Sequence, residues 1–421
     1  MLSLSAYRKK FKKAAAEFNF SNLPAGDRKL LQEYACKYFF SYQELHFLYN
    51  CLLNLYMWDV PPFWHLLETR QQYIPNPQNK KTVINSIKKY FYQLRANPKY
   101  YKGQLPRPPQ KKVNYIKKKN NKFWGRCPAY SPNTVCCGLY TIDAVKGCPF
   151  HCSYCSIQTF YTQNIEFTAN LANGLKNIKL SAHKLYHFGT GQSSDSLVFG
   201  NKNNTLSELT EFAAIHPNII LEFKTKSINI NFFKKQQNLP PNIVISWSLN
   251  TDTITENEEH FTPLSTAKIK AAQELAGKGI KIAFHFHPVV FYAGWFAEYK
   301  KLCQTVVNSF SPEQIAFISF GTVIFIKPVI KELCKQKLKS KILQMELVPN
   351  PDNKLTYPNH VKEELFNAMY SFFAKWHQKV FFYLCMEPEN IWRSTFNFSY
   401  KNNKIFEEEW CNNVMQKLKQ R

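Results

Sequence analysis

Three cysteines lie close together in the chain, at Cys148, Cys152 and Cys155, in the spacing C-x3-C-x2-C. Three thiolates on one tight loop can bind a single compact metal centre and leave one further coordination position open. In a four-iron cluster, a ligand that is not part of the protein could occupy the open iron. The spacing therefore predicts a [4Fe-4S] cluster held by these three side chains.

Two other interpretations of the cysteine loop stay open. Structural zinc normally takes four ligands, and His151, which lies inside the loop, would crowd the other three. The cysteines could also be plain thiols, because the chain has twelve cysteines and reads as a protein of a reducing compartment, where disulfides are rare. We expect the iron-sulfur cluster rather than zinc or unliganded thiols.

Short apolar runs separated by amphipathic segments begin at about residue 136 and predict repeated βα units with parallel strands. Six units indicate a partial, TIM-like (β/α)6 barrel. In such barrels the reacting groups lie at the carboxyl ends of the strands, and the cysteine loop follows the first strand. The six predicted strands are Leu139–Val145, Leu185–Gly189, Ile219–Lys224, Ile243–Leu249, Ile280–Phe286 and Ile315–Phe320.

The 421-residue chain is long enough for one large domain or two to three ordinary ones. Apolar positions at helical spacing predict a helical region over residues 1–75. Residues 76–126 read as a basic linker or arm, 127–345 as the barrel and 346–421 as a mainly helical C-terminal region. The predicted fold class is therefore α/β, a partial barrel between an N-terminal helical and basic extension and a C-terminal helical segment.

Basic side chains outnumber acidic ones by 55 to 29, and the net charge of +26 favours polyanionic partners such as nucleic acid. An AT-rich genome would also raise the lysine content, so the location of the charge is more informative than its total. Residues 80–126, here called the basic segment, hold fifteen Lys and Arg and no Asp or Glu, interleaved with Tyr, Phe and Pro. The basic segment either tracks phosphates and stacks on bases or is a solvated linker.

The apolar stretches of the chain predict no membrane span. The start Met1–Ser5 lacks a long apolar core, and the basic cluster follows it rather than preceding it. The most apolar long stretch, residues 47–64, is interrupted by Asn, Asp and Pro and reads as a buried helix. We therefore expect a cytoplasmic protein with no membrane partner.

The cysteine loop, placed directly after the first strand of a six-unit βα region, resembles that of radical S-adenosylmethionine (SAM) enzymes, in which the open iron binds the amino acid end of SAM. Within this group, residues 125–335 resemble the spore photoproduct lyase branch of DNA repair photolyases. The resemblance implies a [4Fe-4S] cluster and SAM as cofactors, and a reductase, flavodoxin or ferredoxin as electron donor. It also implies reductive cleavage of SAM to a 5′-deoxyadenosyl radical that abstracts a hydrogen atom from a base in nucleic acid, most simply DNA.

The loop after the second predicted strand matches this branch in the stretch 189–197. By resemblance, Gly191, Gln192, Ser194 and Asp195 surround the amino and ribose groups of SAM. Glycine allows close backbone approach, and the Ser and Asp side chains can form hydrogen bonds. Without the resemblance, the stretch would read as a flexible Gly-Ser loop.

Polar residues after the third and fourth strands match the same branch. Lys226 resembles the lysine that pairs with the SAM carboxylate, although alone it would read as a surface lysine. Ser248 and Asn250 resemble the polar pair that completes the SAM pocket, although their alternation is also ordinary for a strand end. His287, at the fifth-strand exit, could touch substrate or only bond to backbone.

Two positions depart from the lyase pattern. The lyase has a hydrogen-donating cysteine in the second-strand loop, where this chain has Gln192. It also has a tyrosine on each side of the third cluster cysteine, whereas here Tyr154 is present and Ser156 replaces the second. Tyr154 is the candidate for relaying a hydrogen atom. The departures leave two alternatives open, a radical SAM enzyme acting on RNA, a peptide or a small metabolite, and a nucleic-acid-binding protein with a structural metal centre.

Three further cysteines, Cys127, Cys136 and Cys137, precede the cluster loop and resemble an extra set in less characterised members of the branch. They could bind a second metal, replace the missing hydrogen donor or pack in the core. Adjacent cysteines in a strand point to opposite faces, so Cys136 and Cys137 are not expected to serve one site. The remaining cysteines are expected to be core thiols: Cys36, Cys51, Cys303, Cys334, Cys385 and Cys411.

Overall fold

Two units make up the chain, residues 1–108 with 331–346 and residues 109–330 with 347–421. The computed structural model describes residues 3–64, 80–110, 112–160, 164–336 and 338–420. The end of the predicted N-terminal helical region, 65–79, and Lys111 of the basic segment lie outside the described residues. The boundary between the units after residue 108 divides the basic segment, which the sequence assigned to a single linker or arm.

The first unit is helical, as its apolar spacing predicts. In its third helix the buried leucines recur every three or four residues, at Leu45, Leu48, Leu52 and Leu55. The first part of the basic segment is also helical, because Val83, Ile84, Ile87 and Phe91 form one buried face. The helices are α1 (Leu4–Glu17), α2 (Ala25–Tyr38), α3 (Tyr42–Met57) and α5 (Lys80–Ala96).

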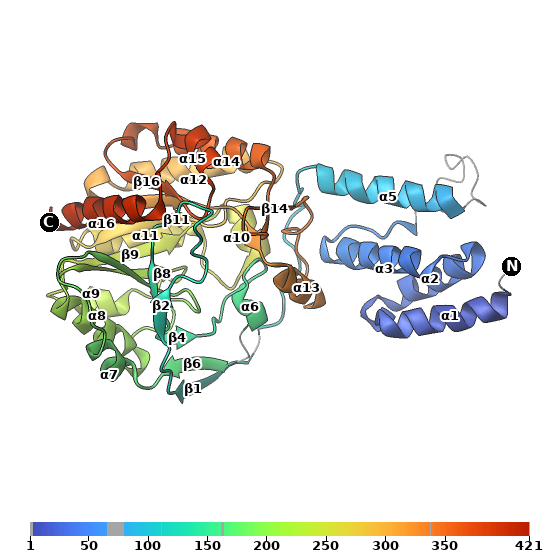
Figure 1. The fold of residues 1–421 in the computed structure, drawn as a ribbon, viewed down its shortest axis with the longest axis horizontal. Helices are drawn as coiled ribbons and strands as arrows, with labels where there is room; N and C mark the ends of the chain where they lie inside the picture. Colours follow the sequence, from blue (N-terminus) through green and yellow to red (C-terminus); the bar gives the residue numbers. More distant parts are fainter. Residues whose placement is uncertain (1–2, 65–79, 111, 161–163, 337, 421) are drawn as a thin grey trace. The chain divides into compact units, whose positions relative to one another are not determined.

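The second unit is an α/β fold built on an eight-stranded, open and curled sheet (Figure 1). Its strand order is β16-β12-β11-β9-β8-β7-β3-β2, and all neighbours are parallel except β2 and β3. Each of the six predicted strand regions contributes one strand. The strands are β2 (Trp124–Arg126), β3 (Tyr140–Ile142), β7 (Tyr186–Thr190), β8 (Ile219–Thr225), β9 (Ile243–Ser248), β11 (Lys281–Phe286), β12 (Ile315–Phe320) and β16 (Phe381–Leu384).

The sheet has seven parallel strands where the sequence predicted six. The seventh, β16, comes from the C-terminal region, which was predicted to be mainly helical. Its four-residue run Phe-Phe-Tyr-Leu is apolar enough to pair with β12 inside the unit. The carboxyl edge of the sheet therefore includes the end of β16, which contributes a residue to a pocket described below.

Helices α8 (Thr205–Ile215), α11 (Ser265–Ala276), α12 (Trp295–Ser309), α14 (Asn359–Ser371) and α16 (Asn403–Lys419) pack around the sheet (Figure 1). In α16, Trp410 stacks on His187 of β7 at a ring distance of 3.8 Å and also contacts Phe317 of β12. Helix α16 thus packs against strands from distant parts of the sheet. The aromatic residues Trp376 and Trp392 of the C-terminal region are buried, which agrees with a packing role.

Short strands hold the cysteine loop. A three-stranded sheet pairs β6 (Asn164–Thr168) with β1 (Asn114–Lys118) and with β4 (Val145–Lys146). A two-stranded sheet pairs β5 (His151–Cys152) with β10 (Glu259–His260), which follows the short helix α10 (Asp252–Glu258). Within the part of the chain that the structure describes, no helix is both long and apolar enough to cross a membrane.

The remaining elements lie between these or beyond the sheet. They are α6 (Ile157–Phe160), α7 (Leu171–Lys176), α9 (Asn231–Lys235), α13 (Lys327–Lys335), α15 (Glu389–Phe396), β13 (Ile324–Phe325), β14 (Val348–Pro349) and β15 (Leu355–Thr356).

Candidate functional site

The cysteine loop begins at Gly147, which the backbone requires to be glycine. Its φ is +85°, and an added Cβ would lie 2.6 Å from the carbonyl oxygen of Asn164. Its amide donates to the carbonyl of Ser193 at 2.8 Å, and its carbonyl accepts from Ser194 Oγ at 2.5 Å. These bonds fix the start of the cysteine loop to the loop after β7.

The three predicted cluster ligands lie on one short loop of the structure. Cys148 and Cys155 are partly exposed and Cys152 is buried. Burial raises the pKa of Cys148, and Asp195, Cys152 and Cys155 raise it further. No three His, Cys, Asp or Glu side chains among the described residues are grouped as ligands of one metal ion. The loop presents three neighbouring thiols rather than a preformed single-ion site.

Strand β10 holds the middle of the cysteine loop from a distant part of the chain. Cys152 pairs with Glu259 in the β5–β10 ladder. The Ser153 amide donates to the Glu258 carbonyl at 2.8 Å, and the Ser153 hydroxyl donates to the Glu258 carboxylate. The cysteine loop is therefore fixed to the segment that follows β9 as well as to the loop after β7.

Asp195, a predicted SAM contact, uses both carboxylate oxygens within the protein. Oδ1 accepts from the amides of Leu197 and Val198 at 3.0 and 2.9 Å and from Thr225 Oγ1 at 2.8 Å. Oδ2 accepts from the Lys226 amide at 2.6 Å. Burial raises the pKa of Asp195, and the hydrogen bonds oppose that rise. This arrangement fits a residue that fixes the β7 loop against the end of β8.

The rest of the β7 loop is shaped by a second glycine. Gly191 has φ +86°, and a Cβ there would lie 2.6 Å from the Lys224 carbonyl and 2.7 Å from Ser196 Oγ. Gln192, half-buried, follows directly. Only glycine allows the loop to cross this closely over β8, so Gly191 sets the position of the predicted SAM contacts.

Lys226 points into the unit and is mostly buried, unlike the surface lysine that its position alone would suggest. Its side chain is 16% exposed. Nζ donates to Ser248 Oγ at 2.7 Å and to Glu259 Oε1 at 2.9 Å. The predicted residues Lys226 and Ser248 therefore contact each other directly.

The carboxylate of Glu259 contacts three of the predicted residues, Tyr154, Lys226 and Asn250. Besides Lys226, Oε1 accepts from Tyr154 OH at 2.5 Å and from Asn250 Nδ2 at 3.2 Å, while Lys268 Nζ lies 3.3 Å from Oε2. Burial alone would raise the pKa of Glu259, but the two ammonium groups and the hydrogen bonds lower it to about 2. Glu259 is thus a buried carboxylate that stays charged.

Sequence reasoning missed Glu259 and Lys268. Both side chains are fully buried, yet each lies in a stretch with charged or polar neighbours that reads as surface. The one signal was Thr251, whose hydroxyl caps α10 and marks a helix that could return the chain to the cysteine loop. Nothing in the sequence pairs β10 with β5.

Glu222 forms a second buried polar cluster deeper in the unit. Its carboxylate accepts from Ser246 Oγ at 2.5 Å and lies 2.5 Å from His285 Nε2 and 2.7 Å from His187 Nε2. Lys224 Nζ lies 3.6 Å away. Burial lowers the pKa of His285 in spite of the neighbouring carboxylate, so this histidine is neutral at pH 7. Burial raises the pKa of Glu222, and Lys224 is the strongest of the neighbours that lower it.

The Glu222 cluster reaches a pocket at the carboxyl ends of β11, β12 and β16. His285 Nδ1 lies 2.5 Å from Ser319 Oγ, which lies 3.1 Å from His287 Nε2. His287 lines a pocket of about 200 Å3 together with Tyr154 and Cys385. We call this the Tyr154 pocket. It contains the candidate relay residue and the fifth-strand histidine that the sequence singled out.

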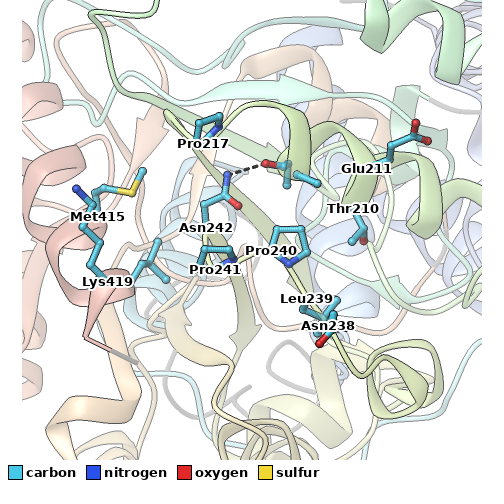
Figure 2. A pocket seen from close by; sticks show the side chains of 13 residues that line it. Thr210, Glu211, Pro217, Asn238, Leu239, Pro240, Pro241, Asn242, Met415 and Lys419 are labelled. Carbon is cyan, nitrogen blue, oxygen red and sulfur yellow. Dashed lines mark hydrogen bonds between the residues drawn. The ribbon is translucent and has the colours of Figure 1, made fainter.

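A larger cavity of the same unit, about 550 Å3, lies at the opposite edge of the sheet (Figure 2). It is lined by residues that precede β8 and β9, such as Pro217 and Asn242. The side chain of Asn242 forms hydrogen bonds with the backbone, because Nδ2 donates to the carbonyls of Ala213, His216 and Ile219 at 2.9 to 3.0 Å. This cavity is mostly apolar, and the chemistry-bearing residues lie at the other edge.

Two expectations about the extra cysteines are wrong. Cys136 and Cys137 do not lie in a strand, so the expectation that they point to opposite faces of a sheet does not apply to them. Cys385 is not a core thiol, because it is partly exposed and lines the Tyr154 pocket. Both errors came from local sequence context, which does not show where a loop or a strand end faces.

A family model described as spore photoproduct lyase matches residues 133–357, more than half of the chain. This chain belongs to the spore photoproduct lyase family. The matched region contains the cysteine loop, the β7 loop, Lys226 and the Glu259 cluster, and it ends before β16. The resemblance that the sequence motifs suggested is thereby confirmed.

Two curated spore photoproduct lyases match across the same part of the chain. The Geobacillus sp. protein is 24% identical over 211 residues, which cover 48% of this chain and 62% of the relative. The Bacillus subtilis protein is 24% identical over 213 residues, 48% of this chain and 61% of the relative. The chain therefore matches about three fifths of the length of these curated relatives.

Solved structures of spore photoproduct lyase share the fold. One, complexed with dinucleoside spore photoproduct, has a TM-score of 0.55 and 20% identity and covers 64% of this chain and 82% of its own. A mutant with bound S-adenosylmethionine and dinucleoside spore photoproduct has a TM-score of 0.55 and 19% identity, with coverages of 72% and 94%. At these identities the likeness establishes the α/β fold with its curled sheet.

Proposed function

We propose that this protein is a radical SAM enzyme that acts on a thymine photoproduct in DNA, in a reaction like that of its spore photoproduct lyase relatives. The observation that carries the proposal is the position of the cysteine loop. Its three thiols lie at the carboxyl edge of the sheet, next to the buried Lys226–Glu259 pair, inside the region that matches the family.

The residues present fit an iron-sulfur cluster. Cys148, Cys152 and Cys155 offer three thiols on one loop. Burial raises the pKa of Cys152 well above that of a free thiol, and the ammonium groups of Lys226 and Lys268 oppose only part of that rise. Two nearby positive charges favour the thiolates that iron binds. When bound, the cluster and SAM supply one electron and a 5′-deoxyadenosyl radical that abstracts hydrogen from the substrate.

The residues also fit SAM. Lys226 offers an ammonium group for a carboxylate, and Ser248 and Glu259 hold that ammonium in place. In this proposal Gly191, Gln192 and Ser194 border the cofactor on the β7 loop, and Asp195 keeps the loop against β8. Asn250 supports the same side, because it bonds both Glu259 and the Pro288 carbonyl at 3.0 Å.

Tyr154 is proposed as the relay residue of the reaction. Its hydroxyl donates to Glu259, and its side chain reaches the Tyr154 pocket. A base that reacts there must leave the duplex stack, because the Tyr154 pocket is a small recess at the strand ends that a stacked base does not reach. The protein side chains around the pocket would exclude water from the reacting groups.

The basic segment is proposed to contact the DNA backbone. On α5 the lysines Lys81, Lys88 and Lys89 are exposed, and Tyr92 is 55% exposed beside them. A row of exposed ammonium groups with an exposed aromatic ring suits phosphates and unpaired bases. The electron would come from a reductase, flavodoxin or ferredoxin.

The test is repair of the dinucleoside spore photoproduct by anaerobically reconstituted protein with dithionite and SAM. Chromatography should show conversion to the undamaged dinucleotide, and the Cys152→Ala variant should show none. If 5′-deoxyadenosine forms but the dinucleotide is never repaired, the substrate is of another class, such as RNA, a peptide or a small metabolite. If the protein holds iron but forms no 5′-deoxyadenosine, the proposed function is wrong.

A further inference from the structure

The end of β16 places one thiol in the Tyr154 pocket. Cys385 follows the last residue of β16, and its amide donates to the Phe320 carbonyl at 2.8 Å, which continues the pairing with β12. Its side chain is partly exposed and lines the pocket together with Tyr154 and His287. Among the described residues that line this pocket, Cys385 is the only thiol.

A glycine brings Cys385 close to the other pocket residues. A Cβ added at Gly321 would lie 3.2 Å from His287 Cδ2 and 3.6 Å from Cys385 Cβ. The absence of a side chain at Gly321 thus leaves His287 and Cys385 on either side of the same backbone position. The backbone at the end of β12 therefore allows His287 and Cys385 to lie close together.

Cys385 is one of three cysteines gathered around Lys224. Burial lowers the pKa of Lys224 and Glu222 raises it, and the thiols of Cys137, Cys385 and Cys127, from three separate parts of the chain, lie close enough to raise it further if they were ionised. Burial raises the pKa of Cys385, as does Cys137, while Lys224 opposes the rise. The Cys385 thiol therefore keeps its proton at neutral pH and carries a hydrogen atom that can be transferred.

The chemistry of the proposed function needs such a group. A substrate that has lost one hydrogen atom and rearranged still carries a carbon radical, which must receive a hydrogen atom before release. The β7 loop offers Gln192, whose amide N–H bonds are poor hydrogen-atom donors. The three cysteines of the cluster loop are assigned to iron and so are not free to donate.

We propose that the thiol of Cys385 donates the hydrogen atom that quenches the substrate radical, an inference that rests on the proposed function. The S–H bond breaks homolytically and a C–H bond forms on the substrate, which leaves a thiyl radical on sulfur. The O–H bond of Tyr154 breaks as the S–H bond re-forms, which leaves a phenoxyl radical. That radical takes back the hydrogen atom that 5′-deoxyadenosine received from the substrate, so a C–H bond of 5′-deoxyadenosine breaks as the O–H bond re-forms and the 5′-deoxyadenosyl radical is regenerated. No external oxidant or reductant is consumed in these transfers.

Cys385 lies outside the region of the chain that matches the family model. The family model ends at residue 357, so both β16 and Cys385 lie beyond it. The donor would thus reach the pocket from the seventh parallel strand instead of the loop after the second. A donor on β16 would also explain why the β7 loop can have Gln192 where the lyase has its hydrogen-donating cysteine.

The first test needs no cofactor. The cluster-free protein is treated anaerobically with iodoacetamide, with and without dinucleoside spore photoproduct, and the modified peptides are quantified by mass spectrometry. Because the raised pKa makes the Cys385 thiol slow to react, the alkylation is run at pH 9.5 with prolonged exposure. We expect the dinucleotide to reduce the alkylation of Cys385 at least fivefold, while that of Cys36, on α2 in the helical unit, is unaffected. Equal alkylation of Cys385 with and without the dinucleotide would overturn the assignment.

The second test separates hydrogen donation from radical formation. Reconstituted Cys385→Ala and Cys385→Ser variants should still form 5′-deoxyadenosine, and should accumulate more of it than the wild type because the hydrogen atom is no longer returned. The repaired dinucleotide formed per 5′-deoxyadenosine should fall at least tenfold. The matched control Cys36→Ala should leave that ratio unchanged. An unchanged ratio in Cys385→Ala would refute the donor alone, whereas a wild-type protein that forms no 5′-deoxyadenosine would refute the proposed function.

Discussion

Two buried carboxylates, Glu222 and Glu259, lie in the same unit but have different partners. Glu259 faces two ammonium groups, a phenol and an amide. Glu222 faces two imidazoles and a hydroxyl, with one ammonium group 3.6 Å away. Both carboxylates have lowered pKa values in spite of burial, which alone would raise them.

The difference lies in how far the partners can adapt. A neutral imidazole nitrogen can donate or accept, depending on its tautomer, whereas an ammonium group only donates. The Glu222 cluster can therefore rearrange its hydrogen bonds when one member changes. The Glu259 cluster cannot, because each oxygen of Glu259 receives a lysine N–H. We infer that the Glu222 cluster, which can rearrange, stabilises the interior of the sheet. The Glu259 cluster, which cannot rearrange, holds the residues of the candidate site in fixed positions.

The largest effect is expected for Glu259→Gln. Whichever way the amide turns, its NH2 group faces the ammonium of Lys226 or of Lys268, and both charges lose their buried counterion. Breaking a buried ion pair costs about 3–5 kcal/mol of unfolding free energy. Urea denaturation of the cluster-free protein measures the change. A loss of unfolding free energy below about 1 kcal/mol would show that water reaches the Glu259 ion pairs and that the Glu259 cluster can rearrange.

A smaller effect is expected for Glu222→Gln. The Gln oxygen can still accept from Ser246 Oγ and from His285 Nε2. The loss should be about 1–3 kcal/mol, mainly because Lys224 is left without a charged partner. The same urea titration checks it. A loss equal to or larger than that of Glu259→Gln would contradict the distinction between the two clusters.

Acidification should weaken the histidine cluster first. Burial lowers the pKa values of His285 and His287 below 6.5, with Lys224 and Lys226 lowering them further and Glu222 opposing this change. Below pH 6.5 the unfolded chain then binds more protons than the folded one, so stability falls as pH falls, by up to about 1.4 kcal/mol per pH unit for each histidine.

Urea midpoints measured at pH 7.5, 6.0 and 5.0 test this expectation, with His287→Gln as the comparison. The variant should lose part of the slope between pH 6.5 and 5. Equal slopes for the variant and the wild type would mean that His287 takes up its proton in the folded state as easily as in the unfolded chain.

The smallest effect is expected at an exposed pair. Arg393 and Glu389 lie one turn apart on α15 with side chains 62% and 60% exposed. Arg393→Ala should change the unfolding free energy by only about 0.3–0.5 kcal/mol, because water screens the pair. The variant serves as the surface control for the two buried carboxylates, and a change near that of Glu222→Gln would show that the denaturation assay does not resolve burial.

The sequence predicted the sheet well because each strand is a short apolar run. Strands β8, β9, β11 and β12 lie within one or two residues of their predicted ends. The seventh strand, β16, was missed, since four apolar residues among helices resemble a helix face as closely as a strand. The division of the chain into two units was also beyond sequence reasoning, because residues 331–346 join the first unit from a distant position.

The sequence singled out Lys226, Ser248 and Asn250 by their resemblance to family residues that follow successive strands. The structure places Lys226 and Asn250 in contact with Glu259 and Ser248 in contact with Lys226, and their role toward SAM stays a prediction. Glu259 itself was missed because its position depends on the pairing of β10 with β5, a long-range contact. Cys385 was misjudged for the same reason, since only the sheet shows where the end of β16 faces.

The central claim is that Cys148, Cys152 and Cys155 hold a cluster that cleaves SAM. The most direct measurement is the amount of 5′-deoxyadenosine formed by the anaerobically reconstituted protein with dithionite and SAM, compared with Cys152→Ala. The account predicts formation in the wild type and none in the variant, together with loss of cluster iron. Iron bound at full level with no 5′-deoxyadenosine, even with damaged DNA present, would contradict the claim, as would a protein that retains only zinc.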